Sequence, residues 1–200
     1  MDIRAILMGL AFALMWSSAF TSARVIVEYA PPLTALALRF LLSGLIGVGI
    51  AFALGQSARL TRTQWMGVLV FGVCQNALYL GLNFVAMQTI DASLAAIIAS
   101  TMPLLVALVG WAFMGQSLKL LGVVGLIAGV IGVAIIMGAR IQGGVDIFGL
   151  ILCVIGMVSL TIATLAVLGA SSGGNVLMIV GLQMLVGSAV LWGPALALET

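Results

Sequence analysis

Twenty-seven consecutive residues, from Ala92 to Leu118, carry no charged side chain and include a proline, Pro103. A helix of this length extends ~40 Å at ~1.5 Å per residue, whereas the hydrocarbon core of a bilayer is ~30 Å thick. We therefore expect the segment to span a membrane. Because proline lacks an N–H and clashes with the carbonyl four residues earlier, the helix should kink around residues 100–102. Loosened backbone at this depth is tolerated only where it is buried in protein or lines a cavity.

The composition is that of a multi-pass membrane protein. The chain is 64% hydrophobic and 6% charged, and it contains no histidine, unlike a soluble domain. A net charge of +2 from scattered residues indicates no nucleic-acid partner. Cys74 and Cys153 lack the paired spacing of a zinc or redox motif, so no metal and no cofactor are expected. Since the chain also lacks an acidic pair and an HExxH motif, an enzyme is disfavoured.

Charged and turn residues divide the chain into seven expected spans, which predicts an all-α bundle of transmembrane helices. The 52 uncharged residues from Ile147 to Leu198 are too many for one crossing. The cluster Ser171-Ser172-Gly173-Gly174-Asn175 divides them as a turn. The expected spans are approximately 4–23, 33–54, 64–87, 92–114, 120–139, 146–168 and 176–197.

Basic residues are unevenly distributed over the two sides of these spans. If the N-terminus is inside, the cytoplasmic side holds Arg4, Arg59, Arg62 and Lys119, and the opposite side holds Arg24 and Arg140. Cytoplasmic loops carry the excess of Lys and Arg, so a cytoplasmic N-terminus is predicted.

An internal repeat is visible at an offset of 144 residues. It pairs the first two spans with the last two, aligns Ser17 with Thr161 and sets Arg39 against Gln183. A unit of five helices is odd, so a second copy must cross the membrane in the opposite sense, as in the inverted repeats of many secondary transporters. Residues 1–144 would form the first unit and residues 145–200 part of the second, and we expect three of ten helices to be missing.

Three segments resemble the EamA-type members of the drug/metabolite transporter superfamily. They are LAFALMWSSAF, PPLTALALRFLLSG and YLGLNFVAMQTIDASLAAIIASTMPLLVALVGWAFMGQSLKLLGVVGLIAGVIGVAII. The last combines a mid-membrane proline, a Gly-Glu-Arg-like turn and a glycine-rich helix, although Gln116 stands where the family commonly has glutamate. The resemblance implies a ten-helix transporter that exports amino acids or related metabolites across a bacterial inner membrane.

The third expected span has the most polar face. Asn76, Tyr79 and Asn83 stand at i, i+3 and i+7 on one stripe of an α-helix, with Gln75 beside them. Unpaired amides facing lipid are costly, so the stripe must turn inward. There it either bonds neighbouring helices or lines a substrate cavity, and we favour the cavity.

Three residues of the first and sixth spans are further candidates. Trp16 lies near mid-membrane, away from the interfaces where tryptophans anchor, so it either stacks on a substrate or packs in the core. Ser17 and Thr161 have matching depths in the repeat and could present hydroxyls to one central site. Such hydroxyls more often bond carbonyls of their own or a neighbouring helix.

Two charged residues could act as charge partners. Arg39 lies ~10 Å below the turn that precedes its helix. It either reaches the membrane interface, pairs with Glu28 or Asp91, or offers its charge to a carboxylate substrate. No carboxylate lies within a span, so an acid for proton coupling would have to be Asp91, at a helix end, or lie in the missing segment.

Glycines 122, 125, 129 and 132 predict close packing of the fifth span, within the chain or in a homodimer.

These features favour a secondary transporter that moves a small-molecule substrate through the lipid bilayer by alternating access. The expected substrate-binding residues are Trp16, Ser17, Asn76, Tyr79, Asn83 and Thr161, with Pro103 shaping its helix. The alternatives are a truncated or non-transporting assembly partner and, less favoured, a membrane-embedded enzyme.

Overall fold

The computed structural model describes residues 3–168 and 172–199, and the regular structure in this part of the chain is entirely helical. Seven helical segments are long and apolar enough to cross a membrane, as the sequence predicts. The elements are α1 (Ile3–Tyr29), α2 (Pro32–Ala53), α3 (Arg62–Phe71), the π-helix η1 (Gly72–Tyr79), α4 (Leu80–Ala86), α5 (Ala92–Ala99), α6 (Met102–Phe113), α7 (Leu120–Gln142), α8 (Ile147–Ala166) and α9 (Val176–Leu198).

The first span is longer than the sequence suggests. Its expected end near residue 23 is wrong, because α1 continues through Arg24 to Tyr29. Helix α1 accommodates the charge since Arg24 Nε lies 3.2 Å from Oε1 of Glu28, and residues four apart are neighbours on a helix face. The helix stops just before Pro31, which disfavours helical geometry in the preceding residue.

The third span consists of α3, η1 and α4 in continuous succession. It begins with a capping box, in which the Thr61 hydroxyl accepts from the Gln64 N–H and the Gln64 side chain accepts from the Thr61 N–H. Its middle, residues 72–79, follows a wider path whose hydrogen bonds join residues five apart. This winding determines which polar side chains share a face.

The fourth span is broken in the stretch where the sequence suggests a kink. Helix α5 ends at Ala99 and α6 begins at Met102, with Ser100 and Thr101 between them. Pro103 lies in the first turn of α6, where a proline is tolerated because the N–H at that position has no helical partner.

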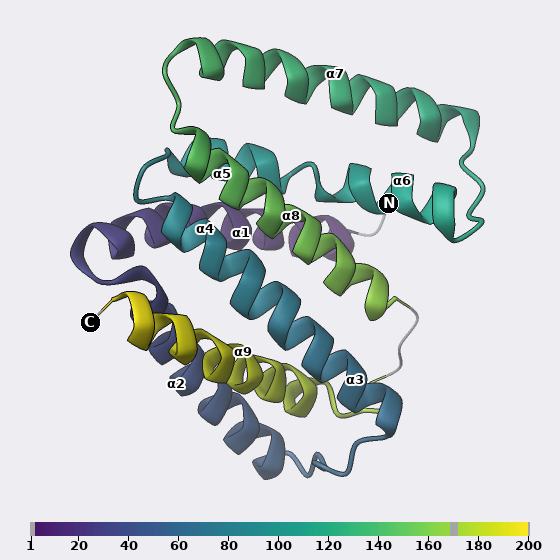
Figure 1. Ribbon diagram of the computed structural model, residues 1–200. Helices are drawn as coiled ribbons and strands as arrows, with labels where there is room; N and C mark the ends of the chain where they lie inside the picture. Colours follow the sequence, from purple (N-terminus) through teal and green to yellow (C-terminus); the bar gives the residue numbers. More distant parts are fainter. Residues whose placement is uncertain (1–2, 169–171, 200) are drawn as a thin grey trace.

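Helices α2 and α9 lie side by side along one edge of the molecule, and the third span and α8 cross its middle (Figure 1). Helix α7 lies at the opposite edge and contacts α6. A Cβ added to Gly129 of α7 would lie 2.8 Å from Leu104 Cδ1 of α6, so this glycine serves packing within the chain. The homodimer stays a prediction, as does the division into repeat units at residue 144.

The turn expected at residues 171–175 is described only in part, because Ser171 lies outside the described residues. Gly173 and Gly174 have φ values of +57° and +84°, which glycine adopts without the steric cost of a Cβ.

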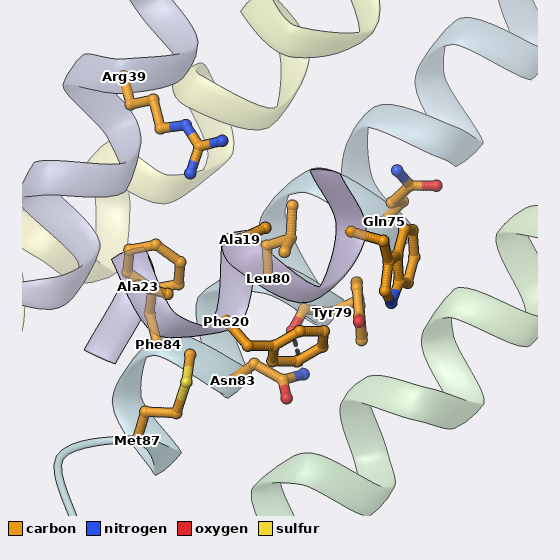
Figure 2. A pocket seen from close by; sticks show the side chains of 11 residues that line it. Ala19, Phe20, Ala23, Arg39, Gln75, Tyr79, Leu80, Asn83, Phe84 and Met87 are labelled. Atoms are coloured by element: carbon orange, nitrogen blue, oxygen red, sulfur yellow. Dashed lines mark hydrogen bonds between the residues drawn. The ribbon is translucent and has the colours of Figure 1, made fainter. Parts of the chain in front are cut away.

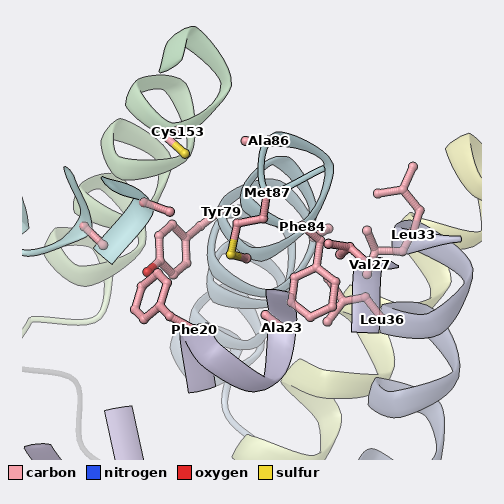
Figure 3. Close-up of a cluster of buried hydrophobic side chains, with 14 of the residues drawn as sticks. Phe20, Ala23, Val27, Leu33, Leu36, Tyr79, Phe84, Ala86, Met87 and Cys153 are labelled. Atoms are coloured by element: carbon pink, nitrogen blue, oxygen red, sulfur yellow. The ribbon is translucent and has the colours of Figure 1, made fainter. Parts of the chain in front are cut away.

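The core lies where α1, α2, α8 and the third span meet (Figure 3). Its buried members include Phe20, Ala23, Leu36, Tyr79, Phe84, Met87 and Cys153. Gly156 brings α8 against the third span, since a Cβ there would lie 2.9 Å from Asn83 Nδ2 and 3.2 Å from the Tyr79 carbonyl oxygen.

Polar side chains tie α2 and α9 together at both ends. The Glu199 carboxylate accepts hydrogen bonds from the Leu33 N–H at 2.7 Å and the Thr34 N–H at 2.8 Å. At the opposite end, Gln56 Oε1 accepts from the Met178 N–H at 3.0 Å. Each contact satisfies an N–H that a helix start leaves without an intrahelical partner.

Replacing Glu199 with alanine is expected to destabilise the α2–α9 pair by about 0.5–2 kcal/mol, the usual cost of losing a helix N-cap. The carboxylate also accepts the Thr34 hydroxyl at 2.7 Å, so Glu199→Gln, which keeps one acceptor oxygen, should lose less. Thermal unfolding of the detergent-solubilised protein measures both. Equal stability of wild type and Glu199→Ala would contradict the assignment.

Candidate substrate-binding site

A cavity of about 160 Å³ lies between α1, α2 and the third span. Figure 2 shows side chains from these three elements converging on it. Its aromatic lining consists of Trp16, Phe20, Tyr79 and Phe84, and its other polar or charged lining of Arg39, Gln75 and Asn83. Apolar walls with a few placed polar groups are the usual form of a small-molecule site.

Helix α1 contributes two aromatic rings to this site, Trp16 and Phe20. The ring centroids of Phe12 and Trp16 are 5.6 Å apart, and those of Trp16 and Phe20 are 6.5 Å apart. Both distances suit tilted aromatic pairs. Trp16 lines the cavity. Its ring lies between those of Phe12 and Phe20, which are one helical turn away on either side.

The third span contributes Tyr79 and Asn83, both nearly inaccessible to solvent. Asn83 Nδ2 donates to the Tyr79 carbonyl at 2.7 Å, and Oδ1 accepts from Cys153 Sγ of α8 at 3.4 Å. Because both ends of the amide have protein partners, Asn83 holds the third span against α8 at the cavity wall.

Asn76 does not line this cavity, and Gln75 does. A π-helix turns roughly 80° per residue and an α-helix ~100°, so Asn76 lies about 120° from Tyr79 around the axis instead of about 60°. Gln75 stays within about 40° of Tyr79 on the same reckoning. The expected stripe assumed α-helical winding, which fails between residues 72 and 79. Asn76 is buried and packs on Gly187 of α9.

Ser17 and Thr161 are not brought together at the cavity. The Ser17 hydroxyl donates to the Leu14 carbonyl at 3.1 Å, and the Thr161 hydroxyl donates to the Met157 carbonyl at 2.9 Å. Both bonds lie within the residue's own helix, which is the alternative that the sequence left open.

Arg39 extends from α2 toward the cavity (Figure 2). Glu28 pairs with Arg24 instead, and within residues 3–168 and 172–199 Arg39 has no salt-bridge partner. A positive charge inside a membrane is costly, and residues that keep one there usually serve a functional site.

Arg24 makes a contact beside the cavity wall. Its guanidinium donates to the Met87 carbonyl, which joins α1 to the end of the third span, and the neighbouring Ala23 and Met87 side chains line the wall. The sequence offered no signal for this contact, since the two residues are 63 positions apart.

Asp91 lies at a separate cavity of about 360 Å³, together with Asp146. The Thr89 hydroxyl donates to the Asp146 carboxylate at 2.6 Å, and the Gly149 N–H donates at 2.9 Å. These hydrogen bonds, that from Thr89 above all, hold the pKa of the Asp146 carboxyl below its ordinary value. Asp146 is therefore ionised at neutral pH.

The broken fourth span lines a third cavity, of about 440 Å³, between α6, α7 and α8. Thr101 and Leu104 contribute to its wall, and almost all of its other lining is aliphatic. Pro103 thus shapes a helix beside an apolar cavity and not beside the one that holds Arg39.

Seven lining residues were not among the predicted site residues, and the aromatic or polar ones among them are Gln75, Phe20 and Phe84. Phe20 lies one helical turn after Trp16, so the α-helical period could have indicated it. Nothing in the sequence distinguishes Gln75 from Asn76 without knowledge of the π-helix.

Comparisons with known proteins place the chain among transporters. A family model described as the EamA-like transporter family matches residues 3–138. The uncharacterized transporter YvbV of Bacillus subtilis (strain 168) is 30% identical over 183 residues, which cover 91% of this chain and 60% of that protein. The aromatic amino acid exporter YddG of Ancylobacter novellus is 29% identical over 139 residues, which cover 70% and 48%. The chain thus spans about half to 60% of these relatives. No solved structure matches it significantly.

Proposed function

Because the chain belongs to the EamA-like transporter family, we propose that it is a secondary transporter that exports small metabolites such as amino acids. Transport would proceed by alternating access, with the N-terminus in the cytoplasm of a bacterial cell and the helices in the inner membrane. The cavity between α1, α2 and the third span supports this proposal, because it combines apolar walls with the charged side chain of Arg39.

The chemistry of the cavity favours a substrate with a carboxylate and a large apolar group. The Arg39 guanidinium can donate two hydrogen bonds to a carboxylate. The rings of Trp16, Phe20 and Phe84 offer stacking surfaces for an aromatic group. One relative is named an aromatic amino acid exporter, which supports the same substrate class.

Of the residues suggested by the sequence, the proposed binding role rests on Trp16, Tyr79 and Asn83, joined by Arg39 and Gln75. Ser17, Asn76 and Thr161 lie outside this cavity and have no part in the proposal. Asp91 remains the proposed acid for proton coupling, and it lines a cavity separate from the proposed substrate cavity.

Export is tested by preloading bacteria with radiolabelled L-phenylalanine and following its efflux. Cells that produce the chain should lose the label faster than cells with an empty vector, and Tyr79→Ala should abolish the difference at equal protein level. Resistance to toxic analogues of other amino acids extends the test to further substrates. Unchanged efflux and unchanged sensitivity to every analogue, with membrane insertion verified, would contradict export and favour an assembly partner.

A further inference from the structure

The π-helix η1 is held by two neighbouring helices. A π-helix is rare and is retained where surrounding contacts or function support it. Its eight residues, Gly72–Tyr79, face α8 on one side and α9 on another.

The contact from α8 is a hydrogen bond. The buried Ser159 hydroxyl donates to the Cys74 carbonyl in the middle of η1, at 2.9 Å. Serine and threonine inside a helix usually bond a carbonyl of the preceding turn, as Thr161 and Thr164 of α8 do with Met157 and Leu160. Ser159 instead directs its hydroxyl to the third span.

The contact from α9 is a close approach of the two helices at Gly187 of α9 and Gly72 of η1. A Cβ on Gly187 would lie 2.4 Å from Asn76 Cβ, and a Cβ on Gly72 would lie 2.8 Å from the Gln183 carbonyl oxygen. The missing side chains leave room for the wide turn of η1 and for Asn76, which therefore faces α9.

We propose that Ser159 is a positioning residue that holds η1 in its π-helical winding, so that Gln75 and not Asn76 faces the substrate cavity. The inference rests on the proposed function, which assigns this cavity to substrate binding. Gln75 presents an amide with two donors and one acceptor, and the choice between the two positions decides whether that amide meets the substrate.

The test measures which position water can reach. Gln75→Cys and Asn76→Cys are compared one at a time in a chain that also carries Cys74→Ala and Cys153→Ser, using a charged methanethiosulfonate reagent. The Cys74 change leaves the acceptor in place because Ser159 bonds the backbone carbonyl. With Ser159 present, position 75 should react faster than position 76.

Ser159→Ala is expected to lower the ratio of the two labelling rates about fivefold, the population shift expected when one ordinary hydrogen bond is lost. Ser159→Thr, which keeps the hydroxyl, should restore the ratio. Ser159→Gly serves as a second donor-free variant if Ser159→Ala is not monodisperse. Thr164→Val is the matched control, because its hydroxyl bonds its own helix.

An unchanged ratio in both donor-free variants would overturn the proposal, and so would an equal fall in Thr164→Val. Labelling needs no transport and no substrate. A chain that fails to export phenylalanine can therefore still pass or fail this test, so the two proposals are judged separately.

Discussion

Replacing Arg39 with glutamine is expected to reduce L-phenylalanine efflux by roughly 10- to 150-fold at low substrate concentration, because a hydrogen bond to a charged group contributes about 1.5–3 kcal/mol. Arg39 lines the cavity and has no salt-bridge partner among the described residues, so its charge is available to a substrate carboxylate. Arg39→Lys keeps the charge but loses the two-point geometry, and its efflux should be intermediate.

Two controls separate recognition from misfolding. Arg59→Gln makes the same chemical change in an exposed loop and should leave efflux unchanged. Phenethylamine lacks the carboxylate, so any efflux of it should be insensitive to Arg39→Gln. If both compounds were slowed equally, Arg39 would not act through the carboxylate.

Replacing Gly187 with alanine is expected to destabilise the fold by about 1–3 kcal/mol, the usual cost of overpacking a tight contact. The added Cβ would lie 2.4 Å from Asn76 Cβ and 3.2 Å from the Gly72 carbonyl oxygen. Neither partner can withdraw easily, since both belong to η1, which α8 holds from another side. Thermal unfolding in detergent measures the loss.

Gly193→Ala is the matched control on α9, because no atom lies within 4 Å of a Cβ at that position. Alanine favours helix more than glycine does, whereas Pro194 disfavours helical geometry in a preceding residue that has a Cβ, so this variant should lose less stability than Gly187→Ala. Adding Asn76→Gly to Gly187→Ala removes the clashing Cβ and should recover part of the stability. Similar losses in Gly187→Ala and Gly193→Ala would contradict the packing argument.

Sequence reasoning predicted the membrane spans well and the site less completely. The bilayer thickness sets the length of the uncharged runs that cross it. The sequence therefore predicts the seven spans with small errors at their ends. Arg24 is an instructive error: a charge suggested a boundary, but Glu28 one turn later lets α1 continue. Likewise, a polar stripe is read from a constant helical period, which η1 does not keep.

The sequence by itself determined that the chain is a bundle of membrane helices, with Arg39 and several aromatic residues inside the expected spans. These properties depend on hydropathy, which is set by residues that are neighbours in the sequence. Only the tertiary structure decided that Gln75 and not Asn76 lines the cavity, because the π-helix depends on Ser159 and Gly187. These residues lie far away in the sequence, so no local pattern in the third span carries that information.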